Sequence, residues 1–394
     1  MNELALVLNS GSSSLKFAVF HAAGATDWPL AARGNIEPFG AAPKMTVRDT
    51  DGSVLPTTAL PAGVHDAAGA LEQVFEWLSA GFPGRRLVGV GHRIVHGGPR
   101  PGPAVVTPEV LAQLRRLVPF APLHQPYNLA GIEAVARRRP EIPQVACFDT
   151  SFHRSLPAVA KLLPLPEEVR GGGVERYGFH GLSFEYIASV LPQVTPQIAQ
   201  RRVIVAHLGN GASLCALRDG VSVENTFGLT ALDGLCMGTR PGAVDPGAIL
   251  YLFQTLGLSV NEVENMLYEK SGLLGISGVS NDMRTLLASR EPAALLAVDY
   301  FVYRVAKEVG ALAAVLGGLD ALVFTAGIGE NSPAIRRRVC AACAWLGIEL
   351  DEGDNAGNAA CISREGSRVS AWRIPTNEEL MIARHMGRVL GARS

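Results

Sequence analysis

The sequence predicts an α/β protein of two or three domains, and three observations indicate this. Short apolar runs of strand length alternate with segments whose apolar residues recur at helical spacing, the pattern of an α/β sheet. The 394 residues exceed what one hydrophobic core usually holds. A strand, a turn rich in glycine and serine, and a second strand occur at residues 4–20 and again at 203–220.

Several apolar runs have the length of buried strands. They are residues 4–8, 15–20, 87–91, 144–148, 203–207, 213–217 and 321–325. The clearest helical segments are residues 66–81, 107–118, 332–347 and 376–391. Thr107 and Pro108 are typical of an N-cap and a first helical position, and Gly347 is typical of a helix end.

The repeated strand-turn-strand pattern has two explanations. The two copies start about 200 residues apart, half of the chain, and each places small polar residues between apolar strands. A duplicated domain explains this spacing. Chance similarity of two Gly-Ser turns is the alternative, and the turns alone leave both open.

Composition excludes several function classes. Apolar residues make up 48% of the chain and the formal net charge is -1, so no global field favours nucleic acid or an anionic membrane. The apolar stretch 311–326 is interrupted by Gly317, Gly318 and Asp320 and is too short to span a bilayer. The first apolar run has no cationic segment before it and is too short for a signal peptide, so we expect a cytoplasmic protein.

Two other features are expected to be structural. Cys340 and Cys343 have C-x-x-C spacing, but no second pair completes a zinc site, so we expect small core residues. The arginine clusters at 115–116, 137–139 and 336–338 are interpreted as solvated helix faces or charges at helix C-termini.

Three turns could hold phosphate although neither common nucleotide loop is present in the sequence. They are N-S-G-S-S-S-L-K at 9–16, H-L-G-N-G-A-S at 207–213 and F-T-A-G-I-G-E-N-S-P at 324–333. Backbone N–H groups and hydroxyls in such turns form concave anion sites, and the third turn leads into a helix. One such turn is explained by glycine alone, but three that follow strands indicate a nucleotide.

Charged residues stand in unusual settings beside these turns. Arg93 lies in G-H-R-I-V-H-G-G, and Arg240 lies in a loop of glycine and proline. Paired arginines suit charge stabilisation in phosphoryl transfer, whereas a solvated arginine is the structural alternative. Asp149 ends an apolar strand, a usual position for a catalytic or metal-positioning group. His180 precedes a helical segment, where capping is the other explanation.

These motifs together resemble the acetate kinase family. The series is N-S-G-S-S-S-L-K-F, G-H-R-I-V-H-G-G, F-D-T-S-F-H, R-Y-G-F-H-G-L-S, H-L-G-N-G-A-S, M-G-T-R, N-D-M-R, A-G-I-G-E-N and P-T-N-E-E-L, in order from residue 4 to about 391. The resemblance implies two duplicated ribonuclease H-like (actin-like ATPase) domains with the nucleotide in the cleft between them. The expected domains are 1–150 plus 376–394, closed by the last helix, and 151–375, which binds nucleotide.

The resemblance also implies a role for each matching residue. Asn9 and Glu378 would place Mg²⁺, with Mn²⁺ as an alternative metal, and Lys16 would lie near the transferred phosphoryl group. Arg93 would bind the substrate carboxylate, Arg240 would stabilise the transition state, Asp149 would be the catalytic carboxylate, and His180 would bind phosphoryl oxygens. The nucleotide would be surrounded by His207, Leu208, Gly209, Asn210, Gly211, Asp282, Met283, Arg284, Gly327, Ile328, Gly329, Glu330 and Asn331.

Elementary chemistry changes one of these roles. A carboxylic acid has a pKa of about 4 to 5, so the nucleophile is already ionised at neutral pH and needs no general base. We therefore expect Asp149 to position Mg²⁺ or an arginine. The difficult step is the approach of an anion to the γ-phosphate, which two guanidiniums and a metal would ease.

Departures from the family pattern concern the acyl pocket. The resemblance implies a pocket lined by Val95, Leu123, Phe179 and the residue at 231, where Ala231 replaces a common proline. Loss of the ring enlarges the pocket by about two methylenes, each worth around 0.8 kcal/mol when buried. The preference between acetate and propionate therefore stays open.

The expected activity is reversible transfer of the γ-phosphoryl group of ATP to acetate, giving acetyl phosphate and ADP. A propionate or short-chain acyl kinase is the near alternative. An actin-like or chaperone-like ATPase without a small acid substrate is the alternative from another class. A serine hydrolase is disfavoured because G-x-S-x-G is absent from the sequence. The resemblance implies a homodimer, with no nucleic acid or membrane partner.

Overall fold

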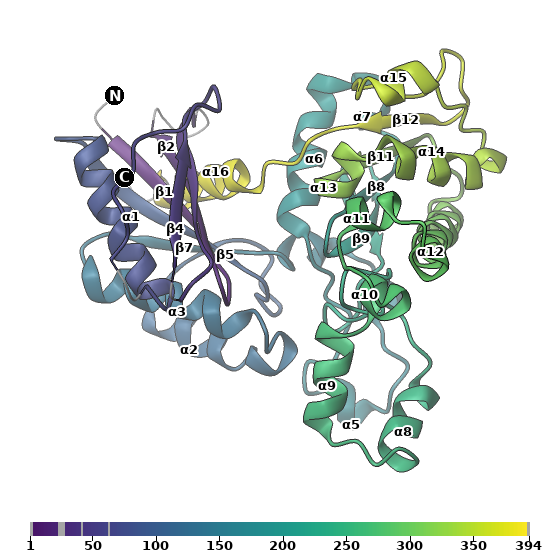
Figure 1. Cartoon of the computed structure of the whole chain (residues 1–394), viewed down its shortest axis with the longest axis horizontal. Helices are drawn as coiled ribbons and strands as arrows, with labels where there is room; N and C mark the ends of the chain where they lie inside the picture. The colour runs from purple at the N-terminus through teal and green to yellow at the C-terminus, as the bar shows by residue number, and fades with distance from the viewer. Residues whose placement is uncertain (1–2, 23–27, 41, 62–63, 392–394) are drawn as a thin grey trace. The chain divides into compact units, whose positions relative to one another are not determined.

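The structure is a computed structural model that describes residues 3–22, 28–40, 42–61 and 64–391. Its internal contacts divide the chain into two compact units (Figure 1). Unit 1 comprises Met1–Arg154 and Asn377–Ser394, and unit 2 comprises Ser155–Thr376. Each unit has its own sheet and its own core.

Within its described residues, unit 1 is built on a seven-stranded sheet in the order β4-β3-β2-β1-β5-β7-β6. The strands are β1 (Glu3–Ser10), β2 (Leu15–His21), β3 (Leu30–Glu37), β4 (Lys44–Arg48), β5 (Arg86–Ile94), β6 (Ala104–Val105) and β7 (Gln144–Phe148). β1 to β4 form antiparallel neighbours, whereas β5 is parallel to both β1 and β7. The carboxyl ends of β1, β5 and β7 therefore meet at one edge.

Helices cover this sheet, and the last one comes from the far end of the chain. They are α1 (Ala67–Gly81), α2 (Pro108–Arg115), α3 (Gln125–Arg138) and α16 (Glu378–Gly391), with a 3-10 turn at Val118–Phe120. In Figure 1, yellow α16 lies beside β1 and β5. The close approach requires glycine in β5: a Cβ at Gly91 would lie 2.6 Å from Ile382 Cγ2, and one at Gly89 would lie 2.8 Å from Leu390 Cδ1.

Unit 2 is built, in the part of the chain described, on a five-stranded sheet in the order β10-β9-β8-β11-β12. Its strands are β8 (Arg202–Leu208), β9 (Ala212–Arg218), β10 (Val221–Asn225), β11 (Ala321–Thr325) and β12 (Ser370–Arg373). β8, β9 and β10 are antiparallel neighbours, and β11 is parallel to β8 and β12. This repeats the order and directions of β3-β2-β1-β5-β7, so the sequence repeat corresponds to a duplicated topology.

In the described residues, unit 2 has more helices than unit 1, and many of them are short. They are α4 (Ala158–Lys161), α5 (Glu167–Arg170), α6 (Gly181–Val194), α7 (Pro196–Ala199), α8 (Pro246–Gln254), α9 (Val260–Glu269), α10 (Gly272–Ser277), α11 (Met283–Ala288), α12 (Pro292–Leu316), α13 (Ala326–Asn331), α14 (Pro333–Ala342) and α15 (Glu352–Ala356), with 3-10 turns at Ser151–Ser155, at the unit boundary, and Ala344–Leu346. α12 packs along β9 and buries Phe301, Val305 and Val309.

The predicted strands and helices are confirmed with shifted ends. Thr107 accepts an N-cap hydrogen bond from Val110 N, as expected for α2, and Asp66 accepts one from Gly69 N at the start of α1. The helix predicted over 332–347 ends earlier, at Ala342, and a 3-10 turn leads to Gly347 in the left-handed conformation. The apolar stretch 311–326 divides between α12 and β11, and in the described residues we find no helix long and apolar enough to cross a membrane.

The two structural expectations have different outcomes. Cys340 and Cys343 are buried free thiols, and burial raises their pKa values to about 12 and about 11. The interpretation of 336–338 as a solvated cluster is wrong for Arg336, which is 0% exposed. Its guanidinium is buried because backbone carbonyls and two asparagines accept its hydrogen bonds.

Candidate active site

In unit 1, the first candidate phosphate turn joins β1 to β2. Asn9 and Lys16 are directly opposite one another in the antiparallel register, so their side chains lie on the same face of the hairpin. The turn is closed by a hydrogen bond of 2.9 Å from Gly11 N to Ser14 O. The hairpin therefore places an amide and an ammonium group together at the carboxyl end of β1.

The neighbouring strand ends bring Arg93 and Asp149 together. Arg93 lies at the end of β5, and Asp149 directly follows β7. Arg93 Nη2 donates to Asp149 Oδ2 at 2.7 Å, and Nε donates to Oδ1 and Oδ2 at 3.2 and 3.1 Å. Glu378, the first residue of α16, places Oε2 3.6 Å from Arg93 Nε. Three predicted residues from distant parts of the sequence thus form one charged cluster.

Burial and charge act against each other in this cluster. Asp149 is 1% exposed, and desolvation raises its pKa, while Arg93 limits that rise. Burial alone would lower the pKa of the Arg93 guanidinium, but Asp149 and Glu378 outweigh it and hold that pKa above its usual range. Desolvation, partly offset by Arg93, raises the pKa of Glu378 to about 7, with Asp149 and Glu379 adding to the rise.

The Arg93 guanidinium keeps hydrogen-bond capacity beyond Asp149. Its side chain is 21% exposed, and Nη1 makes no hydrogen bond to any residue that the structure describes. Arginine has five N–H donors in a planar fork that matches a carboxylate. Asp149 thus fixes one edge of the guanidinium and leaves another edge for an anionic ligand. This geometry supports a positioning role for Asp149.

Two buried residues that the sequence analysis did not select hold this edge of the sheet in place. Asn128 accepts from Val95 N at 3.0 Å and donates to Ser10 O at 2.8 Å, which links the ends of β1 and β5. Gln125 accepts from His96 N and donates to His96 O. Both lie in the segment H-Q-P-Y-N at residues 124–128, where α3 begins. His92, paired to Gln144 at 2.8 Å, is a buried structural histidine.

In unit 2, two histidines stack at the end of β8. His180 and His207 have ring centroids 4.1 Å apart at 26°. His180 Nδ1 pairs with Ser213 Oγ and His207 Nδ1 with Ser183 Oγ, each at 2.8 Å. His180 precedes α6 and has a φ of 58°, a strained value for a residue with a side chain. The two serines thus fix the orientation of both rings.

Arg240 approaches the same histidine from the M-G-T-R loop. Its Nη1 donates to Ala231 O at 2.8 Å, and Met237 N donates to Arg240 O at 3.0 Å to close the loop. A Cβ added to Gly211 would lie 2.9 Å from Arg240 Nη2 and 3.2 Å from His180 Nε2. The second phosphate turn therefore needs glycine at position 211. Because Gly211 has no side chain, a small space remains between the Arg240 guanidinium and the His180 imidazole.

A cavity of about 870 Å³ opens beside these groups within unit 2. Apolar and polar side chains share its wall, a combination that suits a base and a ribose. It is lined by Gly209, Asn210, Asn281, Asp282, Met283, Arg284, Leu287, Ala288, Gly327, Ile328, Asn331, Ser332, Pro333 and Ala334.

Most of the predicted nucleotide residues line this cavity, and the others have different surroundings. His207, Leu208, Gly211, Gly329 and Glu330 do not line it, and Lys16 belongs to unit 1.

The cavity also has lining residues that the sequence analysis did not select. Leu287 follows Met283 by one helical turn, so both side chains lie on the same face of α11. The helical spacing could therefore have predicted that Leu287 lines the cavity with Met283. Asp282 caps α11, and hydrogen bonds from Arg284 lower its pKa to about 2.

The predicted acyl-pocket residues are divided between the units. Val95 follows β5 and is buried, and Leu123 precedes α3, both in unit 1. Phe179 packs edge-to-face on Phe227 at 5.5 Å, and Ala231 holds Arg240 through its carbonyl, both in unit 2.

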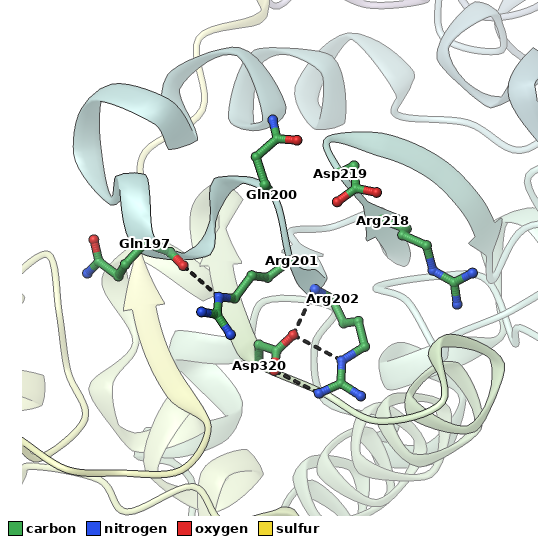
Figure 2. A pocket seen from close by; sticks show the side chains of 7 residues that line it. All are labelled: Gln197, Gln200, Arg201, Arg202, Arg218, Asp219 and Asp320. Carbon is green, nitrogen blue, oxygen red and sulfur yellow. Dashed lines mark hydrogen bonds and ion pairs between the residues drawn. The ribbon is translucent and has the colours of Figure 1, made fainter.

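Another cavity, of about 590 Å³, lies at the opposite ends of the unit 2 strands (Figure 2). Arg202 lines it and forms a fork with Asp320, with Nη2–Oδ1 at 2.8 Å and Nε–Oδ2 at 3.0 Å. Arg201 Nε is bound to Gln197 O at 2.9 Å. The ion pair stabilises the starts of β8 and β11, which explains these charges without a ligand.

Known proteins are similar to this chain over nearly its whole length. The model of the acetokinase family matches residues 4–384. The chain belongs to the acetokinase family. An acetate kinase of Rhodopseudomonas palustris is 54% identical over 395 residues, covering 99% of both chains. One from Rhizobium meliloti is 48% identical and covers 96% of each.

Solved structures of acetokinase-family proteins share the fold. The acetate kinase of Porphyromonas gingivalis has a TM-score of 0.87 at 35% identity, covering 98% of this chain and 100% of that one. A propionate kinase of Francisella tularensis has a TM-score of 0.90 at 37% identity, covering 97% and 98%. The predicted α/β class with two related actin-like ATPase domains is confirmed.

Proposed function

We propose that this member of the acetokinase family reversibly transfers the γ-phosphoryl group of ATP to acetate, giving acetyl phosphate and ADP by direct in-line transfer. Unit 1 would supply Arg93 for the carboxylate of the acid, and unit 2 would bind the nucleotide. The observation that carries the proposal is the Arg93 guanidinium, held on one edge by Asp149 while Nη1 stays available to a carboxylate.

The chemistry needs orientation and charge more than proton transfer. An ionised acetate is already a nucleophile, and Arg93 would neutralise and orient it. Arg240 and His180, which converge at Gly211, would bind the oxygens of the transferred phosphoryl group. Fixed cationic donors at that point stabilise the charge of the transition state without reorganising.

The donors at the proposed metal site fit a magnesium ion. Mg²⁺ prefers oxygen ligands and often takes only one or two carboxylates from the protein, with phosphates and water completing its shell. Asn9 and Glu378 supply such donors, and the raised pKa of Glu378 reflects a buried carboxylate near other acidic groups. Among the described residues, no group of three His, Cys, Asp or Glu could hold a metal ion. Mg²⁺, or Mn²⁺, would neutralise phosphate charge.

The nucleotide would occupy the unit 2 cavity. Met283, Leu287 and Ile328 offer apolar surface for a base, while Asn210 and Asp282 offer hydrogen bonds. Lys16, His207 and Gly211 would act at the phosphate end. We also propose that residues 1–150 with 376–394 and residues 151–375 act as the two domains of the enzyme.

The assembly and location are proposed from the family resemblance. α8 buries none of its residues although Leu250 and Tyr251 are apolar, and such a surface supports a homodimer. We propose a cytoplasmic homodimer. Light scattering on the purified chain would distinguish the dimer from a 41.6 kDa monomer.

The first test is trapping of acyl phosphate with hydroxylamine in the presence of ATP, Mg²⁺ and acids from formate to butyrate. Acetyl hydroxamate should form at the highest rate. If no acid gives product although ADP binds, the proposed reaction is wrong. Steady ATP hydrolysis without any acid would favour an actin-like or chaperone-like ATPase.

Ala231→Pro should shift the acid preference towards acetate. A proline ring fills about two methylenes, so the propionate-to-acetate ratio of kcat/KM should fall roughly tenfold. The carbonyl of residue 231 is retained, and Ala231 N donates to no described residue, so the Arg240 contact can persist. Activity with acetate is therefore the internal control. An unchanged ratio would remove residue 231 from the acyl pocket.

Asp149→Asn should lower kcat by about a hundredfold, because the neutral amide aligns Arg93 more weakly than the carboxylate does. The variant should nevertheless keep any acidic limb of the wild-type pH–rate profile, moved to lower pH because Asp149 no longer raises the pKa of Glu378. A general base would contribute an acidic limb that the variant lacks. Loss of such a limb would contradict the positioning role, and rates from pH 5 to 9 are the measurement.

A further inference from the structure

The segment that lines the nucleotide cavity after β11 has a strained backbone at its first residue. α13 begins at Ala326, whose φ is 64°, and four non-glycine residues in the described chain have positive φ. This conformation is strained for a residue with a Cβ, so surrounding contacts must hold it. Gly327 and Ile328, the next two residues, line the cavity.

The Glu330 side chain supplies those contacts. One carboxylate oxygen, Oε1, accepts from Ala326 N at 2.8 Å, from Thr325 Oγ1 at 3.4 Å and from Thr376 N at 3.0 Å. The carboxylate is thus directed at the strained start of its own helix and at a second segment. It does not line the nucleotide cavity.

The other end of α13 is fixed by the buried Arg336. Its Nη1 donates to Gly329 O and Glu330 O, each at 2.9 Å, and Nε donates to Asn355 Oδ1 at 2.9 Å. With carboxylate at one end and guanidinium at the other, the short helix has little freedom of its own. Loss of the Glu330 carboxylate would therefore act first on the cavity wall that α13 forms.

Thr376 connects this segment to the stacked histidines. Its N–H binds Glu330 Oε1, and its Oγ1 accepts from Ser183 Oγ at 2.9 Å. Ser183 Oγ also pairs with His207 Nδ1 at 2.8 Å. One residue therefore joins the cavity wall to the hydroxyl that orients His207.

We propose that Glu330 and Thr376 are positioning residues: Glu330 holds α13 for the nucleotide, and Thr376 holds His207 through Ser183 for the phosphates. The inference rests on the proposed function but assigns these residues roles without direct contact with a ligand. The backbone N–H of Thr376 binds Glu330 and so contributes to holding α13, whereas its hydroxyl binds Ser183 and so contributes to holding His207. The two roles can therefore be separated by substitution.

Glu330→Ala should raise KM for ATP and Kd for ADP about tenfold, while KM for acetate stays within about twofold. Glu330→Gln should be close to wild type, because its amide oxygen can accept the same hydrogen bonds. Glu352→Ala, which removes an exposed partner of Arg337, is the control and should change neither constant. Kinetics and calorimetric titration with ADP give the two readouts.

Thr376→Val should lower kcat about tenfold with little change in KM for ATP, since it removes only the hydroxyl acceptor. Thr376→Ser should restore kcat. Ser183→Ala interrupts the same chain, so the Thr376→Val/Ser183→Ala double variant should be no slower than the slower single one.

The variants give distinct results if the inference is wrong. If Glu330→Gln is as damaging as Glu330→Ala, the charge of the carboxylate itself contacts metal or nucleotide. Folded Glu330→Ala enzyme with unchanged ADP affinity would show a role in stability alone, and additive loss in the double variant would remove the hydroxyl chain. If wild-type protein neither binds ADP nor makes acyl phosphate, the proposed function fails instead.

Discussion

Replacing Arg93 with alanine should lower kcat/KM for acetate by roughly 10³, the lower range for arginines that stabilise phosphoryl transfer. The substitution removes the proposed carboxylate receptor. It also leaves Asp149, 1% exposed, without the guanidinium that now balances its charge. Removing one partner of a buried ion pair typically costs about 3–5 kcal/mol. The loss of activity and the loss of stability both result from removing the Arg93–Asp149 ion pair, so activity and unfolding temperature should fall together.

Two further variants separate those effects. Arg93→Ala/Asp149→Ala removes both charges, so it should recover stability without recovering activity. Arg115→Ala breaks an exposed ion pair with Glu133 in the same unit and should leave both properties unchanged. Trapping of acyl phosphate and thermal unfolding followed by circular dichroism are the measurements. Near-wild-type turnover by Arg93→Ala would refute the assigned role.

Replacing Arg240 with alanine should also lower kcat by roughly 10³, but with a different kinetic signature. Arg240 converges with His180 on the space at Gly211, where charge is proposed to develop in the transition state. Its loss should therefore reduce kcat and kcat/KM equally and leave KM for both substrates within about twofold. The fold should survive, because the loop is also closed through the Arg240 backbone, whose carbonyl accepts from Met237 N.

The matched control for Arg240 is Arg201, an exposed arginine of unit 2 at the other cavity (Figure 2). Arg201→Ala should have wild-type kcat. Steady-state kinetics with acetate and ATP varied in turn provide the comparison. A large rise in KM for ATP with unchanged kcat would place Arg240 in ground-state nucleotide binding.

The central strands could be predicted because they are buried on both faces. β8, β9 and β11 are almost wholly buried and appear in the sequence as continuous apolar runs. β3 could not be predicted in this way, since only Ala32 and Ile36 are fully buried along it. It also contains Gly34, where a Cβ would lie 2.6 Å from the Phe17 ring. Its place depends on β2, which local patterns do not encode.

The candidate site was predictable in its residue types and less so in its pairings. Arg93 and Asp149 stand out because each lies at the end of an apolar strand, yet their fork joins positions 56 residues apart. The burial of Arg336 was missed because its neighbours Arg337 and Arg338 form exposed ion pairs. The helical period held a signal: Ile335, Val339 and Cys340 are buried, and Arg336 lies on their face of α14.

The position of α16 has a consequence for the order in which this protein can be assembled on the ribosome. Domains generally fold as units during synthesis, from the N-terminus onwards. Unit 1 does not follow this order, because α16 packs on β5 at Gly89 and Gly91 and is translated after the whole of unit 2. Until then its sheet presents an uncovered apolar face, and Arg93 lacks Glu378. The cluster of Arg93, Asp149 and Glu378 is thus completed only after unit 2 has been translated, so a ribosome that stalls before residue 378 releases a chain without it.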